Sequence, residues 1–211
     1  MDLTVLSSIT NKYDSISEKQ IFTCPYVMFS DLESENWKVK PPFKLFEDSN
    51  RNAKIPKVLS HKFSGEYSLW IDGNIEILVD PTTLVEKYLD GFDICFFNHP
   101  LRHCAYSELD LLKNGGYDSG ELMDRQMSYY AKENYPRENG LQAGSVILRR
   151  HTPQVVAFNN MWWSEITTGS RRDQLSLDYC LWKTGLKPNH FPGYHQAQYG
   201  GSDLFVSHNH N

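Results

Sequence analysis

The sequence is short of positive charge and has no long apolar segment. Its 211 residues contain 21 Lys and Arg against 26 Asp and Glu, which gives a formal net charge of −5. A nucleic-acid-binding surface needs clustered Lys and Arg, so this composition argues against a nucleic-acid partner. The chain has no run of about 18 apolar residues and does not open on a signal peptide. We therefore expect no membrane segment and a cytoplasmic location.

Cysteine is also scarce. The four cysteines lie far apart and include no Cys-x-x-Cys pair. This spacing argues against the usual zinc motifs and against a disulfide framework. We expect reduced thiols at Cys24, Cys95, Cys104 and Cys180.

The apolar and aromatic content is sufficient for one complete core. Hydrophobic residues make up 40% of the chain and aromatic residues 13%, with 12 Tyr and 5 Trp. A chain of this length and composition is expected to form a single domain, residues 1–211. Most of the aromatic rings should pack in the core, although some are suited to stacking on flat ligands or sugar rings.

One stretch, residues 67–76, combines a buried strand with polar groups at its end. The segment Tyr-Ser-Leu-Trp-Ile is apolar on both faces and is followed by Asp72, Gly73 and Asn74. In α/β domains, ligands bind at the carboxyl edge of the sheet, where such strands end. Two oxygen-bearing side chains beside a glycine could hold a divalent cation against a diphosphate. An ordinary Asp-Gly-Asn turn is the alternative.

The rest of the chain alternates apolar strands with helices, as in an α/β fold. We expect strands at residues 3–9, 26–29, 67–71, 93–97 and 140–149. Helices are expected after Pro56, at 81–89 with Asp80 as N-cap, twice between 106 and 134, at 154–167, and from near Ser170. The helix after Pro56 would carry Lys57 and His61 on one face. The chain from Lys187 onward is expected to be loop-like.

These features together resemble the GT-A-fold glycosyltransferases. The resemblance rests on the order and spacing of residues 70–74, 142–149, 162–165 and 173–174 and the late histidines. The same series resembles a family of plant and microbial glycosyltransferase-like domains, and the N-terminal glycosyltransferase domain of a multi-domain chlorella-virus enzyme that builds capsid glycans. It implies a mixed, mostly parallel sheet flanked by helices, with the nucleotide at the carboxyl edge. For a viral chain, the location would be the host-cell cytoplasm.

The resemblance also implies a UDP-sugar donor and a bound Mn²⁺ or Mg²⁺. Asp72 occupies the first acidic position of the family motif, whereas Asn74 stands where the family normally has a stronger acidic ligand. A late histidine often completes such a site, and His208 is the favoured candidate over His190 and His195. A structural role for these histidines is the alternative.

The nucleotide itself should be held by residues near the first two strands. Tyr13 is expected to stack on or flank the uracil, and Asp31 to hydrogen-bond the base or the ribose. Lys57 is the candidate for a second positive charge beside the diphosphate. An exposed lysine without a ligand is the alternative for Lys57.

At the reacting carbon, the resemblance points to Asp173 and Gln174, because an Asp-Gln pair at the start of a late helix lies beside the donor sugar in retaining enzymes. Glu165, next to two tryptophans, is a second candidate, as a general base or part of an acceptor wall. A helix-capping role is the alternative for Asp173.

The predicted function is transfer of a hexose or deoxyhexose from a UDP-sugar to a glycan or glycoprotein acceptor, with retention favoured over inversion. A catalytically silent nucleotide-sugar- or carbohydrate-binding domain and a nucleotide-sugar hydrolase are the alternatives. Further domains of a larger chain are expected partners.

Overall fold

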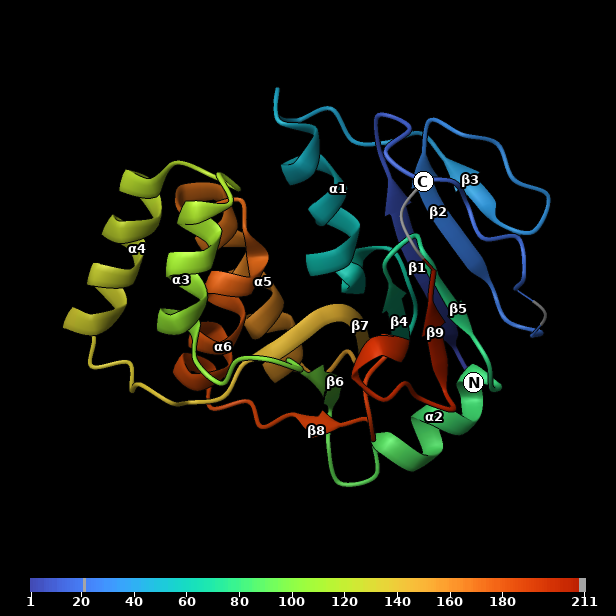
Figure 1. Ribbon diagram of the computed structural model, residues 1–211. Helices are drawn as coiled ribbons and strands as arrows, with labels where there is room; N and C mark the ends of the chain where they lie inside the picture. The colour runs from blue at the N-terminus through green and yellow to red at the C-terminus, as the bar shows by residue number, and fades with distance from the viewer. Residues whose placement is uncertain (21, 209–211) are drawn as a thin grey trace.

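The computed structural model describes residues 1–20 and 22–208. Within them, seven strands form one mixed sheet in the order β3-β2-β1-β4-β7-β6-β8 (Figure 1). Their bounds are Leu3–Ile9 for β1, Tyr26–Ser30 for β2, Lys38–Lys40 for β3, Tyr67–Ile71 for β4, Ile94–Asn98 for β6, Gln142–Arg150 for β7 and Asn189–His190 for β8. Only β7 runs antiparallel to its neighbours, β4 and β6. The prediction of an α/β fold with a mixed, mostly parallel sheet is therefore confirmed.

Helices cover both faces of this sheet (Figure 1). They are α1 (Ser49–Val58), α2 (Pro81–Tyr88), α3 (Ala105–Asn114), α4 (Gly120–Lys132), α5 (Pro153–Thr168) and α6 (Asp173–Thr184). Two short 3₁₀ segments occur at Ser60–Lys62 and Ala197–Tyr199. A second, two-stranded sheet pairs β5 (Ile75–Ile77) with β9 (Phe205–Ser207). No helix in the described residues is both long and apolar enough to span a membrane.

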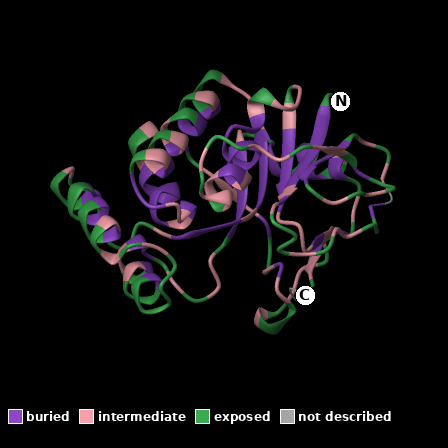
Figure 2. Cartoon of the chain, turned by 90° about the horizontal axis from the view of Figure 1, so that it is seen from above, coloured by how far each residue is buried: buried purple, intermediate pink, exposed green. Residues whose placement is uncertain are grey.

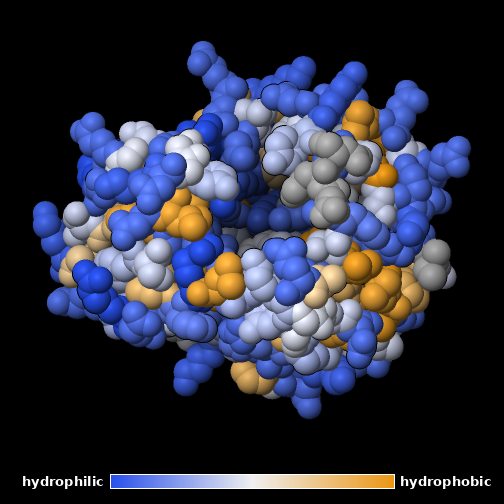
Figure 3. Space-filling model, viewed as in Figure 1, coloured by the Kyte–Doolittle hydropathy of each residue, from blue (hydrophilic) through white to orange (hydrophobic). Residues whose placement is uncertain are grey.

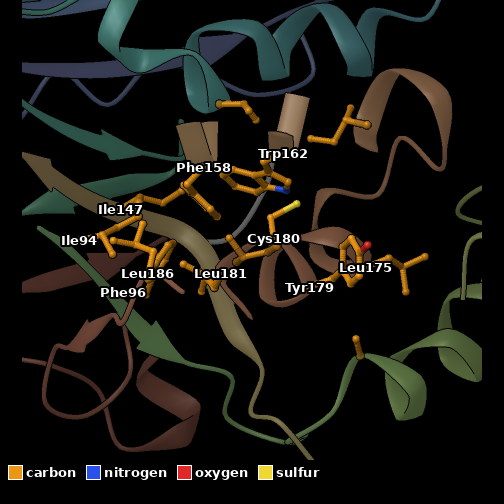
Figure 4. Close-up of a cluster of buried hydrophobic side chains, with 14 of the residues drawn as sticks. Ile94, Phe96, Ile147, Phe158, Trp162, Leu175, Tyr179, Cys180, Leu181 and Leu186 are labelled. Atoms are coloured by element: carbon orange, nitrogen blue, oxygen red, sulfur yellow. The ribbon is translucent and has the colours of Figure 1, made fainter. Parts of the chain in front are cut away.

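The sheet is buried on both faces, as its apolar strands predict. Along β1 and β4, Leu6 and Trp70 belong to one hydrophobic cluster, whereas Val5 and Leu69 belong to another. The first cluster joins the sheet to α5 and α6, and Figure 4 shows its side chains around Trp162. The second joins the sheet to α2 and to the β5–β9 sheet. Figure 2 shows the result, with buried strands in the middle and exposed outer helix faces.

Local signals placed most helices correctly. Asp80 accepts a hydrogen bond from the Thr82 amide at 2.9 Å, and Pro81 is the first residue of α2, as predicted. The expected break between two helices after residue 113 separates α3 from α4.

The predicted helix after Pro56 was wrong. Helix α1 begins at Ser49, where Asp48 accepts a hydrogen bond from the Asn50 amide at 3.0 Å, and Pro56 lies inside it. The helix ends at Val58, and His61 belongs to the following 3₁₀ segment, so Lys57 and His61 do not share a helical face. The side-chain cap at Asp48 decides where the helix starts. The segment from Lys187, expected to be loop-like, also contains the short strands β8 and β9.

Candidate functional site

The polar strand ends open into one cleft. The space-filling view has a hollow near the middle of one face, surrounded mainly by hydrophilic residues (Figure 3). A cleft of about 550 Å³ lies between the end of β1, the end of β4, the start of β7, one face of α1 and the start of α6. Its lining includes Tyr13, Lys54, Lys57, Asp72, Asn74, Gly144, Arg172, Asp173, Gln174 and His195. Six of the predicted site residues therefore share one cavity: Tyr13, Lys57, Asp72, Asn74, Asp173 and Gln174.

The deepest part of the cleft is a set of buried ion pairs, which we call the floor: Lys54, Lys57 and Asp173. The Lys57 Nζ lies 2.7 Å from Asp173 Oδ2, and the Lys54 Nζ lies 3.8 Å from Asp173 Oδ1. The Asp173 side chain is only 11% exposed. Helix α1 presents both lysines on one face because they are three residues apart.

These ion pairs decide the protonation of the floor. Burial alone would raise the pKa of Asp173, but Lys54, Lys57 and Arg172 outweigh it and hold that pKa well below its usual range. Burial alone would likewise lower the pKa of Lys57, yet Asp173 and Asp72 keep it raised. Asp173 is therefore a carboxylate and Lys57 an ammonium ion at neutral pH.

Asp173 is the first residue of α6, but it does not cap that helix. The N-cap position is Arg172, which makes no side-chain capping bond. The Asp173 carboxylate instead faces Lys57, and its backbone carbonyl accepts a hydrogen bond from Trp162 Nε1 at 3.1 Å. Its neighbour Gln174 donates from Nε2 to the backbone carbonyl of Gln142 on β7. The capping alternative therefore does not account for this carboxylate.

The opposite side of the cleft is more exposed, and we call its residues Tyr13, Asp72 and Asn74 the rim. Asp72 follows β4, and its Oδ1 accepts a hydrogen bond from Trp70 Nε1 at 2.9 Å. The same oxygen lies 3.6 Å from Lys57 Nζ, so Lys57 bridges the rim and the floor. The Asp72 side chain is 42% exposed, and Tyr13 is 72% exposed.

A divalent cation fits this cleft only when the donor supplies part of its coordination. Asp72, Asn74 and His195 all line the cavity. The described residues contain no group of three or more His, Cys, Asp or Glu placed to hold a metal. Carboxylate and amide oxygens suit Mg²⁺ and Mn²⁺, and Mg²⁺ is commonly bound by one or two carboxylates plus substrate phosphates. The donor set fits a cation shared with a diphosphate.

His208 does not face the main cleft. Its backbone pairs with that of Asn74, since the His208 amide donates to the Asn74 carbonyl at 2.9 Å. Its ring nitrogen Nε2 lies 3.0 Å from Glu76 Oε2, and its side chain lines a smaller adjoining pocket of about 240 Å³. The late histidine in the cleft is His195, which is buried and hydrogen-bonded to Ser145 Oγ. Burial lowers the pKa of His195, so its ring is neutral at neutral pH.

Two other predicted residues lie outside the cleft. Glu165 Oε2 accepts a hydrogen bond from the Tyr130 hydroxyl at 2.6 Å, between α4 and α5, and lines no part of the cavity. Its position does not support direct contact with the reacting carbon, and its role stays a prediction. Asp31 is exposed after β2 and is also absent from the lining. Its place does not support contact with the base.

Sequence reasoning missed the contribution of Lys54 and Arg172, and it named His195 only as a less favoured alternative to His208. The spacing of Lys54 and Lys57 on one helix was a usable signal. No local sequence signal indicates Arg172, because residues about 50 positions earlier in the chain determine the conformation of the loop before α6. Asp118 accepts hydrogen bonds from Ser170 Oγ and the Arg171 amide at 2.8 Å, and the Tyr117 ring lies 4.8 Å from the Arg172 guanidinium.

Comparisons with known proteins match this chain to glycosyltransferase-like sequences. A family model described as the TOD1/MUCI70 glycosyltransferase-like domain matches residues 36–199. A protein of Arabidopsis thaliana, described as the probable hexosyltransferase MUCI70, is 28% identical over 222 aligned residues. The alignment covers 89% of this chain but only 38% of that protein's length.

Solved structures show the fold. A glycosyltransferase involved in glycosylation of the major capsid of PBCV-1 is 11% identical with a TM-score of 0.52, covering 98% of this chain and 93% of that one. Mouse xyloside xylosyltransferase 1 is 10% identical with a TM-score of 0.48, covering 99% and 98%. The likeness to the PBCV-1 enzyme confirms the expected GT-A architecture.

Proposed function

Because this chain belongs to the TOD1/MUCI70 family of glycosyltransferase-like domains, we propose that it transfers a hexose or deoxyhexose from a UDP-sugar to a glycan or glycoprotein acceptor. The observation that carries the proposal is the Lys57 bridge between two carboxylates in one cleft. Asp72 lies at a strand end suited to the diphosphate, and Asp173 lies in the floor, where the sugar would sit. The descriptions of the plant relative as a probable hexosyltransferase and of the structural relative as a glycosyltransferase involved in capsid glycosylation support the same reaction class.

Departure of the nucleoside diphosphate is the step that needs most help, since negative charge develops on the leaving group. A Mn²⁺ or Mg²⁺ held by Asp72, Asn74 and His195 would supply Lewis-acid stabilisation of that charge. Arg172 lines the cleft beside the floor and provides fixed positive charge there, whereas burial lowers the pKa of Lys54. Lys57 is less available than the sequence implied, because two carboxylates already balance its charge.

Asp173 is better suited to stabilising positive charge than to removing a proton. A general base works best when its pKa lies near the working pH, and the pKa of Asp173 lies far below it. A buried carboxylate can stabilise the oxocarbenium-like sugar as the bond to the diphosphate breaks. This supports a retaining mechanism, with Gln174 and Asp173 beside the donor sugar.

The test is a donor panel with separate readouts for binding, hydrolysis and transfer. Thermal-shift measurements with UDP-, GDP- and ADP-sugars, each with and without Mn²⁺, detect donor binding because a ligand stabilises the native state by mass action. Product analysis with and without an acceptor glycan then separates transfer from hydrolysis. Preferential stabilisation by a UDP-sugar and acceptor-dependent product are expected.

A silent nucleotide-sugar-binding domain is the second candidate, favoured by the neutral Asn74 at the rim. It predicts stabilisation by the donor but no product with any acceptor. A protein that binds none of the UDP-sugars would contradict both proposals.

A further inference from the structure

Two glycines line the cleft, and packing requires only one of them. A Cβ at Gly73 would lie 2.5 Å from Ile9 Cγ1, which is a clash. A Cβ at Gly144 would lie 3.4 Å from Lys57 Nζ and 3.8 Å from Asp173 Oδ2, which are ordinary contact distances. Gly144 also has no positive φ that would demand glycine. An alanine would therefore fit the protein at position 144, so neither packing nor backbone geometry explains the glycine.

The strand is irregular at this point. Phe96 of β6 pairs with Ile147, whereas Phe97 pairs with Ala143, so residues 144–146 of β7 lie within a register shift. Such bulges often occur beside active sites, where they redirect the strand. The neighbouring Ser145 carbonyl accepts a hydrogen bond from the Asp72 amide at 2.9 Å. Gly144 thus lies beside the floor residues Lys57 and Asp173. The next residue, Ser145, binds the backbone amide of the rim residue Asp72.

The space beside Gly144 adjoins charged atoms, so its occupant must be polar. A carboxylate oxygen can accept more than one hydrogen bond, and Lys57 is the ion-pair partner of Asp173 Oδ2. A hydroxyl that enters this space can reach the same carboxylate while its carbon contacts the bare Cα of Gly144. A methyl group at position 144 would take that volume from the ligand without displacing any protein atom.

We propose that Gly144 determines which donor sugars the enzyme accepts, by leaving room for a hydroxyl or hydroxymethyl group against the Lys57–Asp173 ion pair. The inference rests on the proposed function and deepens it. The favoured donor is a neutral pyranose that directs such a group at Asp173. Donors that lack the group gain little from the space, and their use depends less on residue 144.

Gly144→Ala tests the inference directly. Calorimetry should give the same UDP affinity for the variant and the parent, within about twofold, because the nucleotide lies toward Tyr13. The affinity for the preferred UDP-hexose and its kcat/KM should both fall, by roughly 10- to 200-fold, the range for one methyl-sized change in a pocket. UDP-pentoses and deoxy-sugar donors should be affected less, so the donor preference shifts toward them.

Gly120→Ala is the matched control. Gly120, at the start of α4, also has an ordinary backbone conformation, and the nearest atom to an added Cβ is Lys113 Cε at 3.5 Å. It lies outside the cleft lining. Both variants should keep or raise the thermal midpoint, since an unstrained Gly-to-Ala change restricts the unfolded chain. The control should leave all donor affinities unchanged.

The outcomes separate the inference from the function on which it rests. Unchanged UDP-sugar affinities in Gly144→Ala, or equal losses for UDP and UDP-sugar, would overturn the role of Gly144 while leaving the glycosyltransferase assignment in place. A fall in the thermal midpoint of Gly144→Ala alone would also overturn it, because the Cβ would then disturb the protein. A parent protein that binds no UDP-sugar would contradict the proposed function instead.

Discussion

The floor and the rim of the cleft differ in how far the protein itself balances their charges. At the floor, Lys57 and Asp173 are buried and 2.7 Å apart, so the charged groups are positioned before any ligand arrives. At the rim, Tyr13 and Asp72 are substantially exposed, and the neutral Asn74 adds no charge. Preorganised charge at a reacting centre costs no reorganisation during the reaction. The floor therefore suits chemistry, whereas the rim suits reversible binding of a ligand that brings its own charge.

The largest expected effect comes from removing the floor carboxylate. Asp173→Asn leaves two buried lysines with less compensation, and breaking a buried ion pair in this way costs about 3–5 kcal/mol of stability. Turnover should fall by a factor of about 100 or more, while the UDP affinity of the folded protein changes little. Urea unfolding, calorimetry with UDP and initial rates below the unfolding temperature give the three quantities. Parallel losses of UDP binding and turnover would indicate that Asp173 contributes to donor binding instead of to the chemical step.

Asp72→Asn is the matched change at the rim. Because the side chain is partly exposed, its removal should cost no more than about 1 kcal/mol of stability. The expected loss is the enhancement of UDP binding by Mn²⁺, which calorimetry measures with and without the cation. If UDP binds the variant and the parent equally well in Mn²⁺, Asp72 is not a ligand. Asn74→Asp should have the opposite effect and tighten Mn²⁺ binding, because it adds a negative charge to the site.

Tyr13→Ala removes the exposed ring of the rim. By analogy with base stacking on aromatic side chains, the free energy of UDP binding should weaken by about 1–3 kcal/mol. Competition between UDP, GDP and ADP measures base preference in the same experiment. An unchanged UDP affinity would show that the ring does not contact the base.

A second buried carboxylate on α6, Asp178, should give the opposite pH dependence of stability from that of Asp173. Asp178 accepts a hydrogen bond from the Gln142 amide at 3.0 Å, and burial raises its pKa from 3.8 to about 7. The folded state therefore binds more protons than the unfolded state between these values, so stability should fall as the pH rises from about 4 to 7. Asp178→Asn should flatten that part of the urea-unfolding profile. Asp173 has the opposite shift, so its contribution to stability is lost progressively as the pH falls below about 4.

The smallest effect on activity is expected for Glu165→Gln. The glutamine can still accept the hydrogen bond from Tyr130, so the change should cost about 1 kcal/mol of stability. Turnover should stay within about twofold of the parent, since no part of Glu165 lines the cleft. A loss of turnover as large as that of Asp173→Asn would indicate that Glu165 acts at the reacting carbon.

Sequence reasoning succeeded where local chemistry decides the structure. The Asp80 cap, the apolar strand before Asp72 and the small residues of β7 are readable without tertiary information. It failed where packing decides. Glu165 lies on a correctly predicted helix, but its carboxylate accepts a hydrogen bond from Tyr130 of α4 and lies outside the cleft. Among the late histidines, the fold of the segment after residue 187 selects His195 over His208, and no local pattern encodes that choice.

The pairing of β5 with β9 has a consequence for the order of events during synthesis. Strand β5 follows Asn74 directly, but its partner β9 lies about 130 residues later in the chain. Domains emerge from the ribosome N-terminal end first. The lysines of α1 and the strand before Asp72 are thus available early, whereas the segment that contains His195 and His208, whose backbone bonds to Asn74, is made after them. A nascent chain cannot present the complete cleft until residue 207 has emerged.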